Sequence, residues 1–74
     1  MFEEYIQELT RQKKQLAKIK SKSDRTLRIG AWVDLNLAVF VAMSKFADVD
    51  REAWLAAGEL KWDAYQRGRD AINA

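Results

Sequence analysis

The sequence has no cysteine and no histidine, which removes the devices that usually stabilise small domains. Without cysteine there is no disulfide, and without either residue the common ligands of a structural zinc site are missing. The chain has 74 residues, and it is one small domain at most. A domain of this size buries only about 60% of the surface of its unfolded chain. We therefore expect it to gain burial by self-association, most simply as a two-fold dimer.

The same absences argue against catalysis. General acid–base or nucleophilic chemistry would fall to carboxylates, lysines or tyrosines. The sequence shows no phosphate-binding loop, no dinucleotide fingerprint and no cluster of metal-ligating residues. Asp34 is the one carboxylate inside an apolar run. It could be a functional acid, but we favour the interpretation that it lies on a solvated edge of the middle helix. We expect a protein that is not an enzyme and that uses no cofactor.

Proline is absent and glycine is scarce, so the turn chemistry of hairpins is missing. From residue 2 to residue 19, apolar side chains recur at spacings of three and four, with Gln12 filling one position of this seam. Asp48 or Asp50 is a candidate N-cap for a similar pattern that runs to Ile72. The sequence predicts an all-α, three-helix antiparallel arrangement with helices at about 2–21, 24–46 and 50–72, in one domain that spans 1–74.

The middle segment allows a second interpretation. Apolar residues alternate from Leu27 to Val33 as in a strand, yet no turn residue divides the longer run that follows. A helix that is apolar on most of its surface explains the same residues, and we favour it. The alternative is a ribbon–helix–helix dimer with an N-terminal helix. In that arrangement a strand at 27–33 would lie in the major groove and expose Thr26, Arg28 and Trp32.

Long hydrophobic runs are also missing. The longest, at 31–43, contains Asp34 and Asn36 and is shorter than the ~20 residues that cross a bilayer. The first ten residues are acidic, unlike a secretory signal or a helix that binds anionic lipid. We expect a cytoplasmic protein that does not bind membranes.

Positive charge is concentrated in one block. Residues 1–10 carry three acids and no base, residues 29–74 carry five bases and seven acids, and residues 11–28 carry eight bases against Asp24 alone. On a helix that continues to about residue 25, most of these bases would form a stripe opposite the apolar seam. Such a stripe can neutralise successive phosphates and release counterions, although it could also be the solvated back of a coiled coil. We interpret it as a DNA-binding surface formed by Arg11, Lys14, Lys18, Lys22, Arg25 and Arg28.

This interpretation divides the domain into a basic helix and arm at 1–28 and apolar core helices at 29–74. The tryptophans could stack on unpaired bases or pack in the core. We favour the core for Trp54 and Trp62 and leave both roles open for Trp32.

The segment "KSDRTLRIGAWV" at 22–33, after a helix rich in Lys, Gln and Leu, resembles small plasmid mobilisation proteins of the MobC/TraD type. Such proteins have a basic cluster that leads into an aliphatic-Gly-Ala segment, and "WDAYQRGRD" at 62–70 is similar to a segment near their end. In this sequence Arg25 and Arg28 correspond to the basic cluster, and Ile29, Gly30 and Ala31 correspond to the aliphatic-Gly-Ala segment. The resemblance implies a relaxosome component that binds DNA and assists a relaxase at a transfer origin.

A different class of function is a protein-interaction module, such as a phage- or plasmid-encoded inhibitor of a host protein. An apparent excess of aromatic residues and an acidic C-terminal half favour it. Salt-sensitive binding to a polyanion such as heparin would distinguish the DNA hypothesis from this one.

Overall fold

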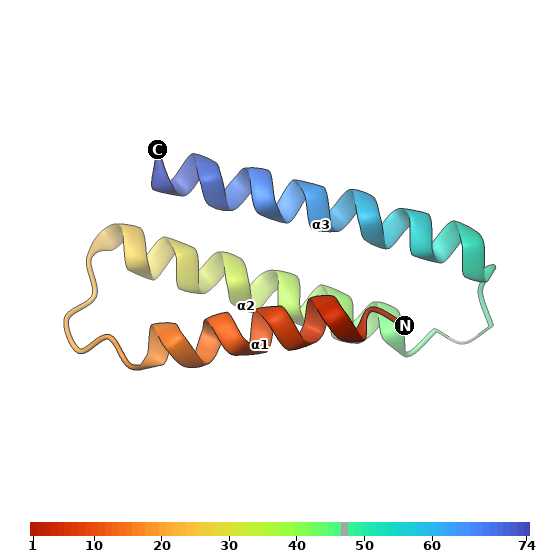
Figure 1. Cartoon of the computed structure of the whole chain (residues 1–74), viewed down its shortest axis with the longest axis horizontal. Helices are drawn as coiled ribbons and strands as arrows, with labels where there is room; N and C mark the ends of the chain where they lie inside the picture. Colours follow the sequence, from red (N-terminus) through yellow and green to blue (C-terminus); the bar gives the residue numbers. More distant parts are fainter. Residues whose placement is uncertain (47) are drawn as a thin grey trace.

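The computed structural model describes residues 1–46 and 48–74, which form three helices joined by short connections (Figure 1). Helix α1 spans Glu3–Ala17, α2 spans Asp24–Ser44 and α3 spans Arg51–Asn73. Each helix runs antiparallel to the one before it, so the predicted all-α, three-helix arrangement is confirmed. α2 packs against both α1 and α3, whereas the backbones of α1 and α3 barely approach each other.

The starts of α2 and α3 are fixed by side-chain caps. The Ser23 hydroxyl accepts the Thr26 backbone N–H at 3.2 Å, and the Asp50 carboxylate accepts the Ala53 N–H at 3.0 Å. These bonds satisfy donors that the first turn of a helix leaves without a partner. The predicted cap at Asp50 is confirmed. Residues 27–33 lie inside α2, so the strand of the ribbon–helix–helix alternative is not formed there.

The end of α1 differs from the prediction. The helix ends at Ala17 rather than at about residue 21, because the Lys18 N–H donates to the Gln15 carbonyl and the Ile19 N–H to the Leu16 carbonyl, which tightens the last turn. The chain then reverses direction before Ser23, the N-cap of α2. A continuous basic helix face through residue 25 is therefore wrong. The division at residue 28 is not an element boundary either, since residues 24–28 belong to α2.

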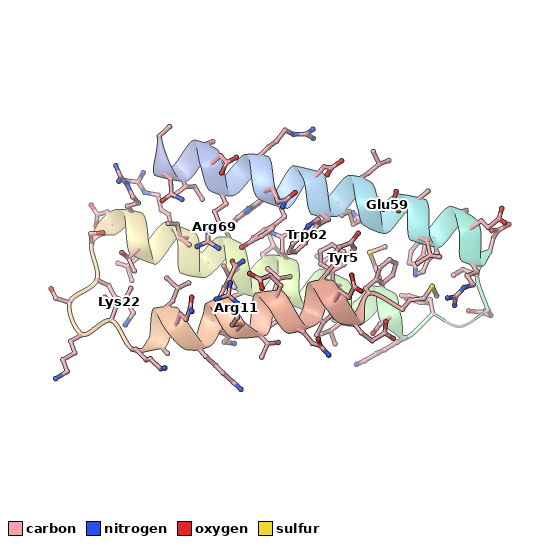
Figure 2. All side chains as sticks on the ribbon, viewed as in Figure 1. Tyr5, Arg11, Lys22, Glu59, Trp62 and Arg69 are labelled. Carbon is pink, nitrogen blue, oxygen red and sulfur yellow. The ribbon has the colours of Figure 1, made fainter. Side chains whose placement is uncertain are left out.

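The core is built mainly from aromatic and aliphatic side chains, most of them from α2, which packs against both other helices. Its buried members are Phe2, Leu9, Ile29, Val33, Phe40, Met43 and Tyr65. Around them, Tyr5 of α1 and Trp62 of α3 stack with their ring centroids 4.6 Å apart (Figure 2). This stack bridges the space that the two backbones leave between them.

The tryptophans are part of this core. The Trp32 indole N–H donates to the Tyr65 carbonyl at 2.8 Å, and the Trp54 indole N–H donates to the Met43 carbonyl at 2.8 Å. All three tryptophans are half-buried and pack against the core. The role left open for Trp32 is therefore structural in this fold.

Two glycines of α3 let rings approach its backbone. A Cβ at Gly58 would collide with the Phe2 ring, and a Cβ at Gly68 would lie 2.6 Å from Cζ2 of Trp32. Phe2 itself has a φ of 66°, in the left-handed region that costs an L-residue roughly 1–2 kcal/mol. Packing of its ring against α3 offsets that cost.

α2 is also long and apolar enough, by length and composition alone, to cross a bilayer. The apolar run at 31–43 is only part of this helix, which extends over 21 residues. In the folded chain, 28% of its apolar window is buried. One face of α2 therefore forms the centre of the core, and another lies open.

Candidate nucleic-acid interface

Antiparallel packing sorts the charged residues into two ends of the molecule. The connection between α1 and α2 lies beside the C-terminus of α3, and the N-terminus lies near the start of α3 (Figure 1). Residues 11–33 and 64–74 form the basic end, which carries ten of the thirteen bases and two of the eleven acids. Residues 1–10 and 34–63 form the acidic end, which carries the remaining three bases and nine acids. The positive block of the sequence thus becomes one pole of a molecule 43 Å long.

All six predicted DNA-binding residues lie exposed on the basic end, but on three different segments. Lys14 is in the last turn of α1, and Lys18 is the C-cap that follows it. Lys22 lies in the connection, where its ammonium group donates to the Ile19 carbonyl at 2.8 Å (Figure 2). Arg25 and Arg28 project from the first turns of α2. The structure brings these residues to one end of the molecule without forming one helical stripe.

Arg11 differs from the other five because it is paired with a carboxylate. Its guanidinium donates two hydrogen bonds to Glu8, one turn earlier on α1, and the Nε–Oε2 distance is 2.9 Å. These bonds, together with one from Gln12, lower the pKa of Glu8 to about 2. The neighbouring carboxylate compensates part of the charge of Arg11. Of the six residues, Arg11 should therefore attract a phosphate least.

Sequence reasoning missed the contribution of α3 to this end. Arg67 is exposed near the C-terminus of α3, and Arg69 lies on the face of α3 that meets α1. The Arg69 guanidinium donates to Oε1 of Gln12, which also accepts the Tyr65 hydroxyl. Arg69 therefore links the helices and adds positive charge beneath the surface bases. The predicted antiparallel order already implied this contribution. In such an arrangement the third helix runs in the same direction as the first, so it ends at the same end of the molecule as the connection between the first and second helices.

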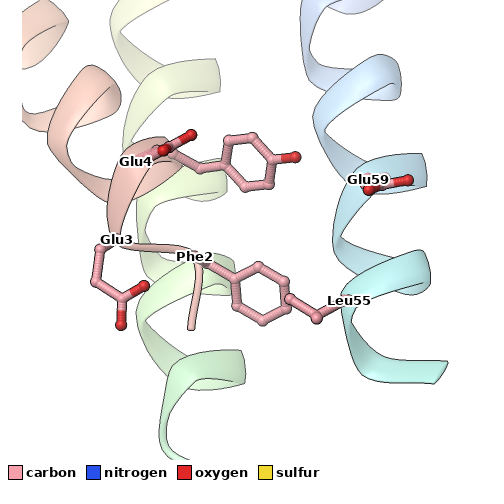
Figure 3. Close-up of a pocket in the computed structure, with 6 residues that line it drawn as sticks. Phe2, Glu3, Glu4, Leu55 and Glu59 are labelled. Carbon is pink, nitrogen blue, oxygen red and sulfur yellow. The ribbon is translucent and has the colours of Figure 1, made fainter. Parts of the chain in front are cut away.

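The acidic end has a hollow with a different character. Its volume is about 220 Å³, its apolar walls are Phe2, Tyr5 and Leu55, and carboxylates surround it (Figure 3). Burial, followed by the charges of Glu59, Glu4 and Asp63, raises the pKa of Tyr5. This end repels polyanions, which leaves the basic end as the surface open to them.

Asp34 has the solvated position that the sequence favoured. Its carboxylate is 58% exposed and lies 3.3 Å from the Lys13 ammonium group at the edge of α2. Within residues 1–46 and 48–74, no three acidic side chains converge on a point that could hold a metal ion. Neither observation points to catalytic chemistry.

Comparison with protein-family models, curated proteins and solved structures finds no match. The resemblance to mobilisation proteins of the MobC/TraD type therefore stays a prediction.

The two segments that carry this resemblance are neighbours in the fold. Residues 22–33 form the last part of the connection and the first half of α2, and residues 62–70 lie in the second half of α3. Trp32 and Tyr65, one from each segment, stack with their ring centroids 6.3 Å apart. Both segments therefore build the basic end.

Proposed function

We propose that this chain is a non-enzymatic DNA-binding accessory protein that holds phosphates through its basic end. The observation that carries the proposal is the gathering of ten bases against two acids at one pole. A surface with this excess attracts a polyanion and releases condensed counterions when it binds. The proposed contacts are Lys14, Lys18, Lys22, Arg25 and Arg28, with a smaller contribution from Arg11.

Recognition of this kind is directed at the backbone of the nucleic acid. The contacting residues come from a helix end, a connection and the start of a second helix, so they follow no single groove. Long, exposed lysine and arginine side chains suit phosphates, whereas base edges require polar groups held in fixed positions. We therefore expect strong dependence on salt and little dependence on sequence.

Within this function, the resemblance of the two short segments favours a relaxosome component. Such a protein would bind near a transfer origin and assist a relaxase there. Seven of the eight aromatic residues, all except the exposed Phe46, pack in or against the core, which weakens the support for a protein-interaction module.

The test is fluorescence anisotropy of labelled duplex and single-stranded DNA, titrated with protein at several salt concentrations. The variant R25A/R28A loses two exposed bases from the basic end, and R51A/K61A loses two exposed bases from the acidic end. Both variants have the same net charge, so a difference between them reports where the DNA lies. Circular dichroism checks that helicity is retained in each.

We expect R25A/R28A to weaken binding at low salt and to flatten the slope of log K against log salt by about 1–2. R51A/K61A should bind as the unmodified chain does. Equal losses in both variants would indicate attraction by net charge alone. Absence of binding to either DNA at low salt would remove the proposed function.

A further inference from the structure

The face of α2 that points away from the core is apolar and uncovered along most of its length. Leu27 and Leu35 are 55% and 56% exposed, and three exposed alanines lie between and beyond them. We define this outer face as Leu27, Ala31, Leu35, Ala38 and Ala42. At 3.6 residues per turn, the five positions fall within an arc of about 80°, opposite Val33 and Phe40 in the core. Aligned apolar positions of this kind indicate a surface that packs against something.

We propose that the outer face of α2 docks against the same face of a second copy, with the two α2 helices antiparallel. This inference does not rest on DNA binding. Small side chains let two helices approach closely, and the three alanines occupy the middle and end of the face. The helix has 21 residues and is ~32 Å long, which gives a long interface for so small a chain.

Charge determines the direction of pairing. An antiparallel pair places the basic end of each copy beside the acidic end of the other. A parallel pair would instead place the two basic ends side by side, where like charges repel. The separation of charge described above is therefore self-complementary for one orientation only. A two-fold axis then repeats every contact, as in most dimers of identical chains.

The outer face also matches itself in register. When Ala31 lies opposite Ala38 of the second copy, Leu27 falls opposite Ala42, so a large side chain meets a small one. In the same register, Asp24 at one end of the helix lies opposite Lys45 at the other, and both are exposed. Opposite charges therefore close the interface at each end.

A lipid surface is a less suitable occupant. Helices that lie on membranes present bulky apolar side chains flanked by bases. Three of the five positions here are alanine, and Asp34 borders the face near its centre. A second copy of the chain can accommodate these features, because small residues favour close packing and Asp34 keeps its contact with Lys13.

Sedimentation equilibrium of the full chain tests the association. We expect a mass of twice 8.6 kDa, and an L35E variant should weaken association at least about a hundredfold. The matched control is L60E, because Leu60 is 71% exposed but lies on α3. L60E should remain a dimer. Should L35E lose helicity as well while L60E does not, the proposal is still supported, because Leu35 is largely exposed in the single chain.

Disulfide cross-linking tests the orientation against a background free of cysteine. We expect a mixture of A31C and isotope-labelled A38C to form mixed cross-linked dimers under mild oxidation, and neither variant alone to cross-link efficiently. Efficient self-linking of each variant would indicate a parallel pair and overturn the antiparallel assignment. A monomeric mass at all concentrations would overturn the dimer, and if the chain also bound neutral lipid vesicles, the outer face would be assigned to lipid.

Discussion

The hydroxyl of Tyr65, on α3, donates a hydrogen bond to Oε1 of Gln12, on α1. Both residues are buried, and the same oxygen accepts the guanidinium of Arg69. The amide nitrogen of Gln12 donates to Glu8 at 2.9 Å, so both the oxygen and the nitrogen of this amide have partners. Because the backbones of α1 and α3 barely approach each other, these side-chain hydrogen bonds link the two outer helices across the gap.

Truncation of Gln12 should therefore destabilise the fold. Q12A removes the acceptor of the buried Tyr65 hydroxyl and leaves Arg69 with only its longer contact to that hydroxyl, at 3.3 Å, which costs roughly 1–3 kcal/mol. The free energy of unfolding, measured in urea by circular dichroism, reports the loss. The control Q15A alters an exposed glutamine of the same helix and should change it by less than about 0.5 kcal/mol. Equal effects in the two variants would mean that the network contributes nothing of its own.

The glycines should respond to alanine in opposite directions. At Gly68 a Cβ meets the Trp32 ring, and the bond from its indole N–H to the Tyr65 carbonyl restricts how far that ring can move. G68A should lower the free energy of unfolding by roughly 1–3 kcal/mol. At Gly30 a Cβ meets nothing within 4 Å, so G30A should raise stability by roughly 0.4–1 kcal/mol. Urea titrations of both variants, followed by tryptophan fluorescence, check the sign of each change.

Acid should weaken the contact between Glu8 and Arg11. Hydrogen bonds from Arg11, and then from Gln12, lower the pKa of Glu8 from 4.5 to about 2. A carboxyl with a lowered pKa contributes stability above its unfolded pKa, and this contribution is lost as the pH falls toward its folded pKa. An E8Q variant should therefore be less stable than the unmodified chain at pH 7. The gap should narrow below pH 4.5 and close near pH 2, in urea titrations across that range.

A constant gap between E8Q and the unmodified chain would show that Glu8 acts by packing alone. The effect at pH 7 should be small, because the carboxylate is 36% exposed and solvent screens an ion pair in that position.

Local signals predicted much of this fold. Asp50 caps α3 as expected, and the periodic residues from Phe2 to Leu16 mark the seam of α1, with Gln12 inside it. The end of α1 was missed because Ile19 continues the apolar pattern after the backbone has left the helix. Ser23 was the available signal, since serine is a strong N-cap and a new helix at Asp24 requires the chain to turn before it.

The candidate interface was predictable in composition but not in shape. The block at 11–28 was visible as charge, yet its spread over three segments depends on where α1 ends. Pairing of Arg11 with Glu8 is a choice of side-chain conformation that spacing alone does not determine. To predict the contribution of Arg67 and the position of the acidic end, the direction of α3 must be known. That direction follows from tertiary packing.

The separation of charge along the 43 Å axis also gives a single chain a permanent electric dipole moment. In the field of a nucleic acid, which extends about 8–10 Å at physiological salt, such a chain rotates until its positive pole leads. Antiparallel pairing cancels this moment and leaves a quadrupole, with a positive lobe at each end. The dimer would then approach DNA broadside with two lobes and without a preferred leading end, so the state of association would determine how the molecule is oriented before contact.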